Sequence, residues 1–367
     1  MKILYVQNGS NFHNAGGMEY HLVDISNWMN TNGIETAAAV RKGTYLERVL
    51  LKEKLNTYPL SWTGLAKIFG FFQVARAILK FSPDIISINR ERDIKRSYYI
   101  TRVMGLFMKK RPVMVAIFQN IGVRIRFRLE KLDGLLFLND YTFRDYVAGN
   151  PDAQKKSIII NYGIRMPEIN TRVKFDQNRP RSIFPGVPYP LIGMVGEFRK
   201  NQTELIDVAF HLKKKCTDFT IAFIGKGANH EIQPLQDKIE RLGLSKHFLF
   251  TGGIAYKRIP EVFHDLDLSV STNRAEAFGL VFIESLASYT PLVAFNSGGP
   301  VEILAKGGGV LVHGGAEEMA EKLALLIEDH AKLCSLGMEG RAAAEKYFSI
   351  NAMGEKHLTF YKNLLNA

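Results

Sequence analysis

The hydrophobic positions of the chain follow two alternating patterns. Continuous apolar runs, typical of strands buried in a parallel sheet, alternate with segments in which apolar residues recur at helical spacing. In the first half, strands are expected at 2–7, 36–40, 84–89, 113–118, 135–139 and 158–160, and a helix at 19–30. This alternation predicts an α/β fold with helices on both faces of a parallel sheet.

The pattern breaks at residues 166–190, where five prolines and little periodicity indicate a linker. It then resumes, with strands expected at 191–195, 219–224, 248–251, 268–271, 292–295 and 310–312, and helices at 203–214 and 317–329. We therefore predict two doubly wound, Rossmann-like domains, 1–170 and 171–349, facing each other across a cleft. A final helical segment, 350–367, is expected to pack back on the first domain.

Composition indicates an ordinary globular protein, with 46% hydrophobic and 23% charged residues. No apolar stretch approaches the length of a membrane-spanning helix, and the run that begins the chain is too short for a secretory signal. Cys216 and Cys334 form no CxxC motif and fit reduced thiols. A cytoplasmic location is therefore expected, and a peripheral position on the inner face of the cell membrane is the alternative.

The positive charge is concentrated in the first half. Residues 1–165 contain 25 Lys and Arg and 13 Asp and Glu, so their net charge of +12 equals that of the whole chain. The cations form clusters at 90–96, 109–111 and 124–128. Such a surface favours an anionic partner, although a solvated basic face without a partner has the same composition. No nucleic-acid-binding motif accompanies the clusters, so nucleic acid is not the expected partner.

The segment 276–284, EAFGLVFIE, is the strongest functional motif. It follows the strand expected at 268–271, which places Glu276 on the loop at the carboxyl end of that strand and Glu284 in the next helix. Ligands of open α/β sheets bind at this edge, and carboxylates accept hydrogen bonds from sugar hydroxyls. A plain helix N-terminus, with acidic residues favoured by its dipole, is the structural alternative.

Three glycine loops accompany this motif. Gly16 and Gly17 join the first strand to the first helix, but without the G-x-G-x-x-G spacing of a dinucleotide site. Gly196 ends the strand at 191–195 and precedes Arg199 and Lys200, cations that can stabilise a departing diphosphate. Gly298 and Gly299 follow the strand at 292–295. The first of these loops can also be a simple turn, and the two cations can be exposed residues at the start of a helix.

Together these motifs resemble the donor-binding signature of retaining GT-B glycosyltransferases, family 4. The resemblance spans nearly the whole chain and is strongest at 191–312. It implies a first domain that shapes the acceptor site and a second that binds a nucleotide sugar, expected to be UDP- or GDP-linked. It also implies that sugar transfer proceeds with retention and needs neither a cofactor nor a metal. The Asp265-x-Asp267 sequence, a metal motif in another transferase fold, is expected to be structural.

The resemblance also implies roles for individual residues. Glu276 would hold the transferred sugar, and Glu284 the ribose. The remaining donor-site residues it implies are Gly16, Gly17, Gly196, Ile254, Phe278, Gly279, Leu280, Gly298 and Gly299. Lys200 matches the pattern of the family better than Arg199 does, because Glu197 stands where the family usually has an arginine.

Three positions depart from the family pattern. Gln119 follows the strand at 113–118 where a histidine is common; it can hydrogen-bond a sugar hydroxyl or a diphosphate oxygen but carries no charge. His13 or His21 is a possible substitute. Tyr289 replaces a usual glycine, and Tyr162 separates an asparagine and a glycine that are normally adjacent.

The function that follows is transfer of a sugar to a glycan or lipid-linked acceptor in the synthesis of cell-surface polysaccharide or lipopolysaccharide. The basic first half predicts an anionic or membrane-borne acceptor. The apolar segment 65–81 contains four Phe and three cations, and fits either a helix packed on the sheet or an interfacial helix. The alternatives are a nucleotide-sugar epimerase of the same fold and a catalytically silent glycan- or nucleotide-binding subunit.

Overall fold

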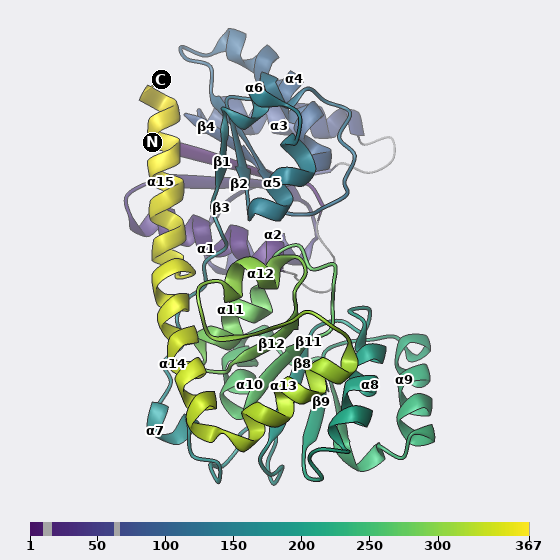
Figure 1. Cartoon of the computed structure of the whole chain (residues 1–367). Coiled ribbons are helices and arrows are strands. Elements are labelled where there is room, and N and C mark those ends of the chain that lie inside the picture. Colours follow the sequence, from purple (N-terminus) through teal and green to yellow (C-terminus); the bar gives the residue numbers. More distant parts are fainter. Residues whose placement is uncertain (10–16, 62–66, 367) are drawn as a thin grey trace. The chain divides into compact units, whose positions relative to one another are not determined.

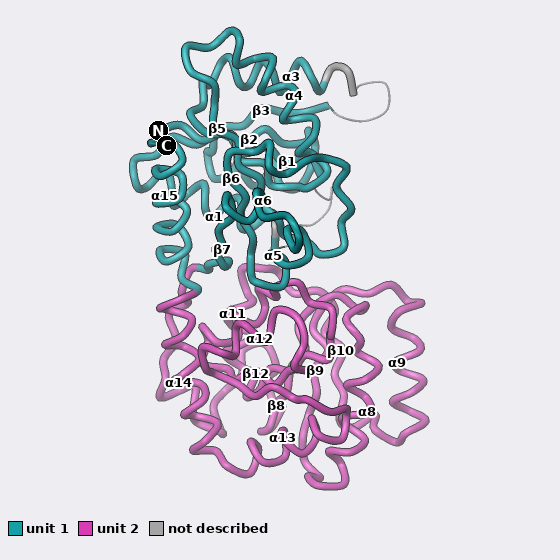
Figure 2. The backbone as a smooth tube through the Cα atoms, turned by 45° about the horizontal axis from the view of Figure 1, so that its top comes forward, with its two compact units in different colours: residues 1–164, 348–367 teal, residues 165–347 magenta. Residues whose placement is uncertain are grey.

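The structure, a computed structural model, describes residues 1–9, 17–61 and 67–366 and divides into two compact units (Figure 2). The first consists of residues 1–164 and 348–367, and the second of residues 165–347. Each unit has one parallel sheet with helices packed around it (Figure 1). The predicted fold class, α/β with two doubly wound Rossmann-like domains, is therefore confirmed.

The first unit contains a seven-stranded parallel sheet in the order β3-β2-β1-β4-β5-β6-β7. Its strands are β1 (Lys2–Gln7), β2 (Glu35–Arg41), β3 (Asn56–Leu60), β4 (Ile85–Ile88), β5 (Val113–Phe118), β6 (Gly134–Phe137) and β7 (Ser157–Ile159). The sequence did not predict β3, which has few apolar residues and contains Pro59. It is an edge strand, the position in a sheet where proline is tolerated because a missing amide breaks no ladder.

The helices of the first unit cover the sheet. They are α1 (Gly17–Thr31), α2 (Tyr45–Lys52), α3 (Lys67–Phe81), α4 (Ile94–Met104), α5 (Asp140–Val147), α6 (Pro151–Gln154) and α15 (Ile350–Asn366), with 3₁₀ turns η2 (Glu91–Asp93), η3 (Gly105–Phe107) and η4 (Leu129–Lys131). One core joins α3, α4 and α5 to the sheet. The last helix, α15, contacts α1, and the Trp28 indole donates to Asn351 Oδ1 at 2.8 Å.

The second unit contains a six-stranded parallel sheet in the order β10-β9-β8-β11-β12-β13. Its strands are β8 (Leu191–Val195), β9 (Thr220–Ile224), β10 (Phe248–Gly252), β11 (Leu268–Ser271), β12 (Leu292–Phe295) and β13 (Gly309–Val312). Its helices are α7 (Thr171–Lys174), α8 (Gln202–Leu212), α9 (Asn229–Arg241), α10 (Ile259–Asp265), α11 (Leu280–Ala287), α12 (Gly299–Leu304), α13 (Ala316–Glu328) and α14 (His330–Tyr347), with 3₁₀ turns η5 (Ser245–His247) and η6 (Tyr256–Arg258). Within the described part of the chain, no helix has the length and apolarity needed to cross a membrane.

The proline-rich segment before β8 is anchored in the second unit. Arg179 and Arg181 are buried and each pairs with an oxygen of Asp267, at 2.7 and 2.8 Å. Asp265 is also buried and accepts from the Ile183 amide at 2.6 Å. The Asp265-x-Asp267 sequence therefore holds this segment to the amino end of β11. The boundary between the units falls at 164/165, where 170/171 was expected, and the segment before 171 is held to the second unit by Pro167 O, which accepts from Arg341 of α14 at 2.8 Å.

Each sheet reverses its strand order next to its first strand. In the first unit β1 lies between β2 and β4, and in the second β8 lies between β9 and β11. The loops that leave the two central strands in each unit therefore diverge to opposite sides. Such switch points, at the carboxyl ends of the strands, are where open α/β sheets bind ligands.

Candidate functional site

The loop after β8 brings Lys200 to the switch point of the second unit. Gly196 has φ of 150°, and a side chain there would press on the Lys200 side chain. Gln202, at the start of α8, holds the loop because its amide donates to Glu197 O at 2.7 Å and accepts from the Lys200 amide at 2.9 Å. Asn201, at the N-cap of α8, adopts a left-handed conformation. The loop thus has a defined shape that directs Lys200 toward β11.

Lys200 meets Glu276 across this switch point. The Lys200 Nζ lies 2.7 Å from Glu276 Oε2, and Asn273 Nδ2 donates to the same oxygen at 3.1 Å. Both partners are largely buried, with 29% and 17% of their side chains exposed. They line a small cavity together with Ser269, Ser271 and Phe282. An ammonium group and a carboxylate therefore lie side by side where the loops after β8 and β11 converge.

Sequence reasoning missed Asn273, which holds the carboxylate of Glu276 together with Lys200. The backbone N–H of Asn273 donates to Ser271 Oγ at 3.3 Å, and its side-chain oxygen accepts from the Ala275 amide at 3.1 Å. An asparagine two residues beyond a buried strand and three before a carboxylate is the signal that could have identified it, because this residue commonly bonds to nearby backbone in turns.

The start of α11 positions the rest of the motif. Gly279 is its N-cap, with φ of 91°, and Leu280 is its first residue. Phe278 is buried, whereas Glu284 is half-buried one turn into the helix. The amino end of α11 therefore lies next to the loop that carries Glu276, an arrangement suited to hydroxyls or an anion.

The glycine pair after β12 packs directly on this loop. The Gly299 amide donates to Glu276 O at 2.8 Å. A Cβ atom at Gly298 would lie 2.4 Å from Glu276 O, and one at Gly299 would lie 2.0 Å from Phe278 O. Gly298 also has φ of 65° and ψ of −144°, a conformation that is almost restricted to glycine. Both glycines are therefore required for the loops after β11 and β12 to touch.

Two of the predicted residues of this unit do not line the small cavity that contains the Lys200–Glu276 pair. Arg199 is 72% exposed and pairs with Glu197, its Nε 2.9 Å from Glu197 Oε2. Ile254, after β10, packs against an apolar cluster that includes Phe184 and Leu191. The loops after β8, β9 and β10 are nevertheless linked, because the Gly225 amide donates to Gly252 O and a Cβ at Gly225 would collide with Gly196 O.

In the first unit, Gln119 lies at the carboxyl edge of the sheet. Glu91 Oε1 accepts from the Gln119 and Asn120 amides, both at 3.1 Å, which fixes the start of the loop after β5. The Gln119 side chain is buried, and neither its amide nitrogen nor its oxygen has a hydrogen-bond partner among the described residues. The same is true of Gln7, at the end of β1. Such groups are ready to bond a ligand, since leaving them unpaired is costly.

The remaining predictions for this unit have different outcomes. Gly17 is exposed and begins α1, whereas Gly16 and His13 lie outside the described residues. His21 is buried in the core, with its ring 4.4 Å from that of Tyr162 and 5.9 Å from that of His357. The tyrosine that departs from the family pattern thus packs on His21, and neither side chain is exposed for a ligand.

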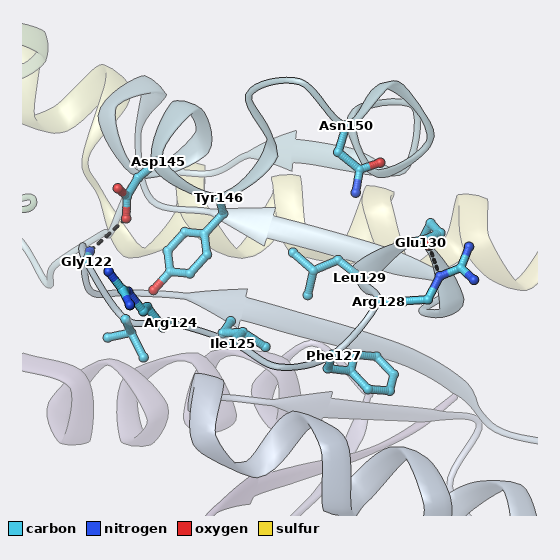
Figure 3. A pocket seen from close by; sticks show the side chains of 11 residues that line it. Gly122, Arg124, Ile125, Phe127, Arg128, Leu129, Glu130, Asp145, Tyr146 and Asn150 are labelled. Atoms are coloured by element: carbon cyan, nitrogen blue, oxygen red, sulfur yellow. Dashed lines mark hydrogen bonds and ion pairs between the residues drawn. The ribbon is translucent and has the colours of Figure 1, made fainter.

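A cavity of about 750 Å³ lies between the loop after β5 and helix α5 (Figure 3). Its ends are fixed by the Asp145 carboxylate, which accepts from the Gly122 amide at 2.7 Å, and by the Arg128–Glu130 ion pair. Tyr146 projects from α5 toward the loop. Residues alternate along the loop: the apolar side chains are at least half-buried, while the arginines are exposed. The apolar set is Val123, Ile125, Phe127 and Leu129, and the exposed set is Arg124, Arg126 and Arg128.

Comparisons with known proteins agree with this geometry. Residues 177–343 match the family model described as glycosyl transferases group 1, and this range contains the whole Lys200–Glu276 site. HepE of Anabaena, solved in complex with UDP, superposes with a TM-score of 0.82 at 18% identity over 99% of this chain and 100% of that one. The fold is therefore that of the GT-B glycosyltransferases, and the family match supports a glycosyltransferase.

Curated relatives match over part of their length. The sulfoquinovosyl transferase SQD2 of Arabidopsis thaliana is 25% identical over 61% of this chain and 43% of its own. The putative glycosyltransferase EpsD of Bacillus subtilis is 31% identical over 42% of this chain and 40% of its own. The chain thus spans about two fifths of the length of the curated relatives that it matches.

Proposed function

We propose that this chain is a retaining, metal-independent glycosyltransferase that moves a sugar from a nucleotide-sugar donor to an anionic or lipid-linked glycan acceptor. The observation that carries the proposal is the Lys200–Glu276 pair at the switch point of the second unit, within the segment that matches glycosyl transferases group 1. The donor is expected to be UDP- or GDP-linked, and HepE, solved with UDP, is a structural neighbour.

Lys200 and Glu276 have complementary roles in this proposal. As the bond to the donor sugar breaks, negative charge develops on the nucleoside diphosphate, and a fixed cation stabilises it. Lys200 Nζ has three protons and uses one of them on Glu276, so two remain for phosphate oxygens. Glu276 holds hydroxyls of the transferred sugar, and Asn273 keeps its carboxylate in place. Glu284, one turn into α11, is assigned to the ribose.

We assign acceptor binding to the first unit. The side-chain amides of Gln119 and Gln7, which have no hydrogen-bond partner among the described residues, lie at the carboxyl edge of its sheet, and the loop that follows Gln119 lines the cavity next to α5. The exposed Arg124 and Arg126 form no ion pair with a described residue, so they are available to an acidic glycan or a lipid phosphate. The lipopolysaccharide core biosynthesis mannosyltransferase LpsB of Rhizobium meliloti, 27% identical over 36% of this chain, supports a role in cell-surface polysaccharide synthesis. A lipid-linked acceptor would bring the chain to the inner face of the cell membrane.

The test begins with thermal stabilisation by UDP, GDP, ADP, dTDP and CMP, with and without EDTA, because a ligand of the native state raises the melting temperature. One nucleotide should stabilise the protein regardless of EDTA. Its sugar conjugate is then incubated with glycan and glycolipid acceptors, and the anomeric configuration of the product is determined by NMR. Stabilisation without transfer would favour a silent binding subunit, and an altered free sugar nucleotide would favour an epimerase.

Variants connect the test to the site. Glu276→Gln keeps the size of the side chain but removes its charge, and it should lower kcat by about a hundred-fold or more while the nucleotide still binds. Glu197→Gln is the matched control, because this carboxylate lies in the loop after β8 and, among the described residues, its side chain pairs with the exposed Arg199. Equal loss in both variants, or loss in neither, would contradict the role of Glu276.

A further inference from the structure

The outer faces of α3, α4 and η3 expose large apolar side chains. In η3, Leu106 is 81% exposed and Phe107 is 73% exposed. Tyr99 and Val103 precede them and are exposed on one face of α4. Phe72 and Leu79 are exposed on one face of α3, about two helical turns apart. The two helices lie side by side and η3 follows α4 (Figure 1), and we call the exposed residues of these three elements the α3–α4 surface.

The exposed charges interleaved with these side chains are basic. Arg76 and Lys80 follow Phe72 at helical spacing on α3, while Lys95 and Arg102 flank Tyr99 on α4. Lys109 and Lys110, both exposed, come directly after η3. Neither helix nor η3 contains an exposed acidic residue; the acids of residues 67–111 are Asp84, which accepts from the Lys2 amide, and the buried Glu91 and Asp93.

The buried face of α3 decides between the two predictions for its sequence, a helix packed on the sheet and an interfacial helix. Val74, Ala77, Ile78 and Phe81 are buried in the core of the unit, so the helix does pack on the sheet. Its opposite face nevertheless carries Phe72 and Leu79, which lie outside the core and are exposed. The helix is therefore apolar on two sides, and only one of them is covered by the protein.

We propose that the α3–α4 surface docks on an anionic lipid bilayer, with Leu106 and Phe107 inserted at the boundary between headgroups and acyl chains. Exposed aromatic and aliphatic residues bordered by Lys and Arg are the chemistry of interfacial binding, since the apolar groups leave water while the cations meet lipid phosphates. A protein partner of mixed charge would not require a surface free of exposed acids. The reason for docking rests on the proposed function, because a lipid-linked acceptor would then reach the first unit from the bilayer.

The experiment is flotation of the whole chain with vesicles. At about 0.1 M salt the protein should float with phosphatidylcholine vesicles containing about 30% phosphatidylglycerol and not with phosphatidylcholine alone. Replacing Leu106→Ser together with Phe107→Ser should reduce the bound fraction at least about ten-fold. Lys109→Glu with Lys110→Glu should give a similar loss that is larger at low salt. The matched controls are Leu325→Ser with Met338→Ser, apolar residues of the second unit that are 60% and 52% exposed, and Arg241→Glu with Lys246→Glu.

The outcomes separate this inference from the proposed function. No flotation of the wild-type chain with anionic vesicles at low salt, or equal flotation of the Leu106/Phe107 variant, would overturn the inference. Concentration-dependent dimers that the same variant abolishes would assign the surface to a second copy of the chain instead. Because the substituted side chains are exposed, thermal stabilisation by the donor nucleotide should be unchanged in every variant. If the wild type itself binds no nucleotide, the proposed function is contradicted and the docking inference is not.

Discussion

Lys200 and Glu276 are 76 residues apart in the sequence, yet Lys200 Nζ lies 2.7 Å from Glu276 Oε2. The contact depends on the strand order of the second sheet, which makes β8 and β11 neighbours although two strands separate them along the chain. Gly196 gives the Lys200 side chain its room on one side, and Gly298 lets the loop of Glu276 rest on the next loop. The ion pair is therefore a product of the topology and of two glycines.

Gly298→Ala should disturb the site through the backbone. A Cβ atom there would lie 2.4 Å from Glu276 O, and the conformation with φ of 65° is itself strained for alanine. We expect a loss of about 1–3 kcal/mol in unfolding free energy and a higher KM for the donor, because the Glu276 loop must move. Denaturant unfolding and steady-state kinetics measure the two effects.

Gly315→Ala is the control for that substitution. Gly315 has φ of −109°, and a Cβ atom would meet nothing within 4 Å. The unfolding free energy and the donor KM of the Gly315→Ala variant should stay close to the wild-type values. If both alanine variants behave alike, close contact at Gly298 does not shape the site.

Gly354→Ala should destabilise the first unit even though alanine favours helices. The new Cβ atom would lie 2.2 Å from the Trp28 ring, so α15 and α1 must separate. Overpacking of this kind costs about 1–3 kcal/mol, which exceeds the helix-propensity gain of about 1 kcal/mol. Urea unfolding followed by far-UV circular dichroism reports the change, because this signal does not depend on Trp28. The added substitution Trp28→Leu should restore part of the loss; a double variant less stable than the sum of the single effects would refute the steric explanation.

The stability of the first unit should fall in mild acid. Burial lowers the pKa of His357 to about 3, and burial together with nearby His357 lowers the pKa of His21 well below its usual value. Between about pH 6.5 and 3 the unfolded chain therefore binds protons that the folded unit excludes. The stabilisation from neutral His357 is complete above about pH 6.5, and it declines by roughly 1.4 kcal/mol for each unit of pH below that.

The measurement is the unfolding free energy of the wild type and His357→Gln at several pH values from neutral to mildly acidic. Near His357, the Tyr361 hydroxyl lies 3.4 Å from its Nδ1, and His21 is the nearby titrating ring. The variant should lose about half of the acid dependence, because His21 remains. An unchanged pH slope would show that His357 does not exclude the proton.

The fold could be predicted from the sequence wherever a buried strand leaves a continuous apolar run. Such runs mark β1, β5, β8 and β12, whereas β3 escaped because a half-exposed edge strand with Pro59 has no such run. The structure also explains why the family usually has a glycine at the position of Tyr289. Its φ is 57°, so the position does require the left-handed conformation that glycine adopts easily, and the tyrosine ring packs on Phe175 and Arg341 instead.

The candidate site could be predicted only in part because partners in space leave no mark at fixed sequence distance. The motif 276–284 identified Glu276 by its place after a strand, but the distinction between Lys200 and Arg199 rested on resemblance alone. In the structure the two cations differ in burial: Lys200 is mostly buried beside Glu276, while Arg199 is exposed and pairs with Glu197. Likewise, exposure of Leu106 and Phe107 could not be read from an apolar sequence, because a core helix has the same composition.

The most direct measurement of the central claim is the affinity of the stabilising nucleoside diphosphate for the wild type, Lys200→Met and Arg199→Met, determined by isothermal titration calorimetry. The account predicts that Lys200→Met weakens binding at least about ten-fold, because a largely buried cation next to the phosphates is lost. Arg199→Met should bind within about two-fold of the wild type, because its exposed guanidinium pairs with Glu197. Equal affinities of Lys200→Met and the wild type would contradict the assignment of the Lys200–Glu276 site to the donor.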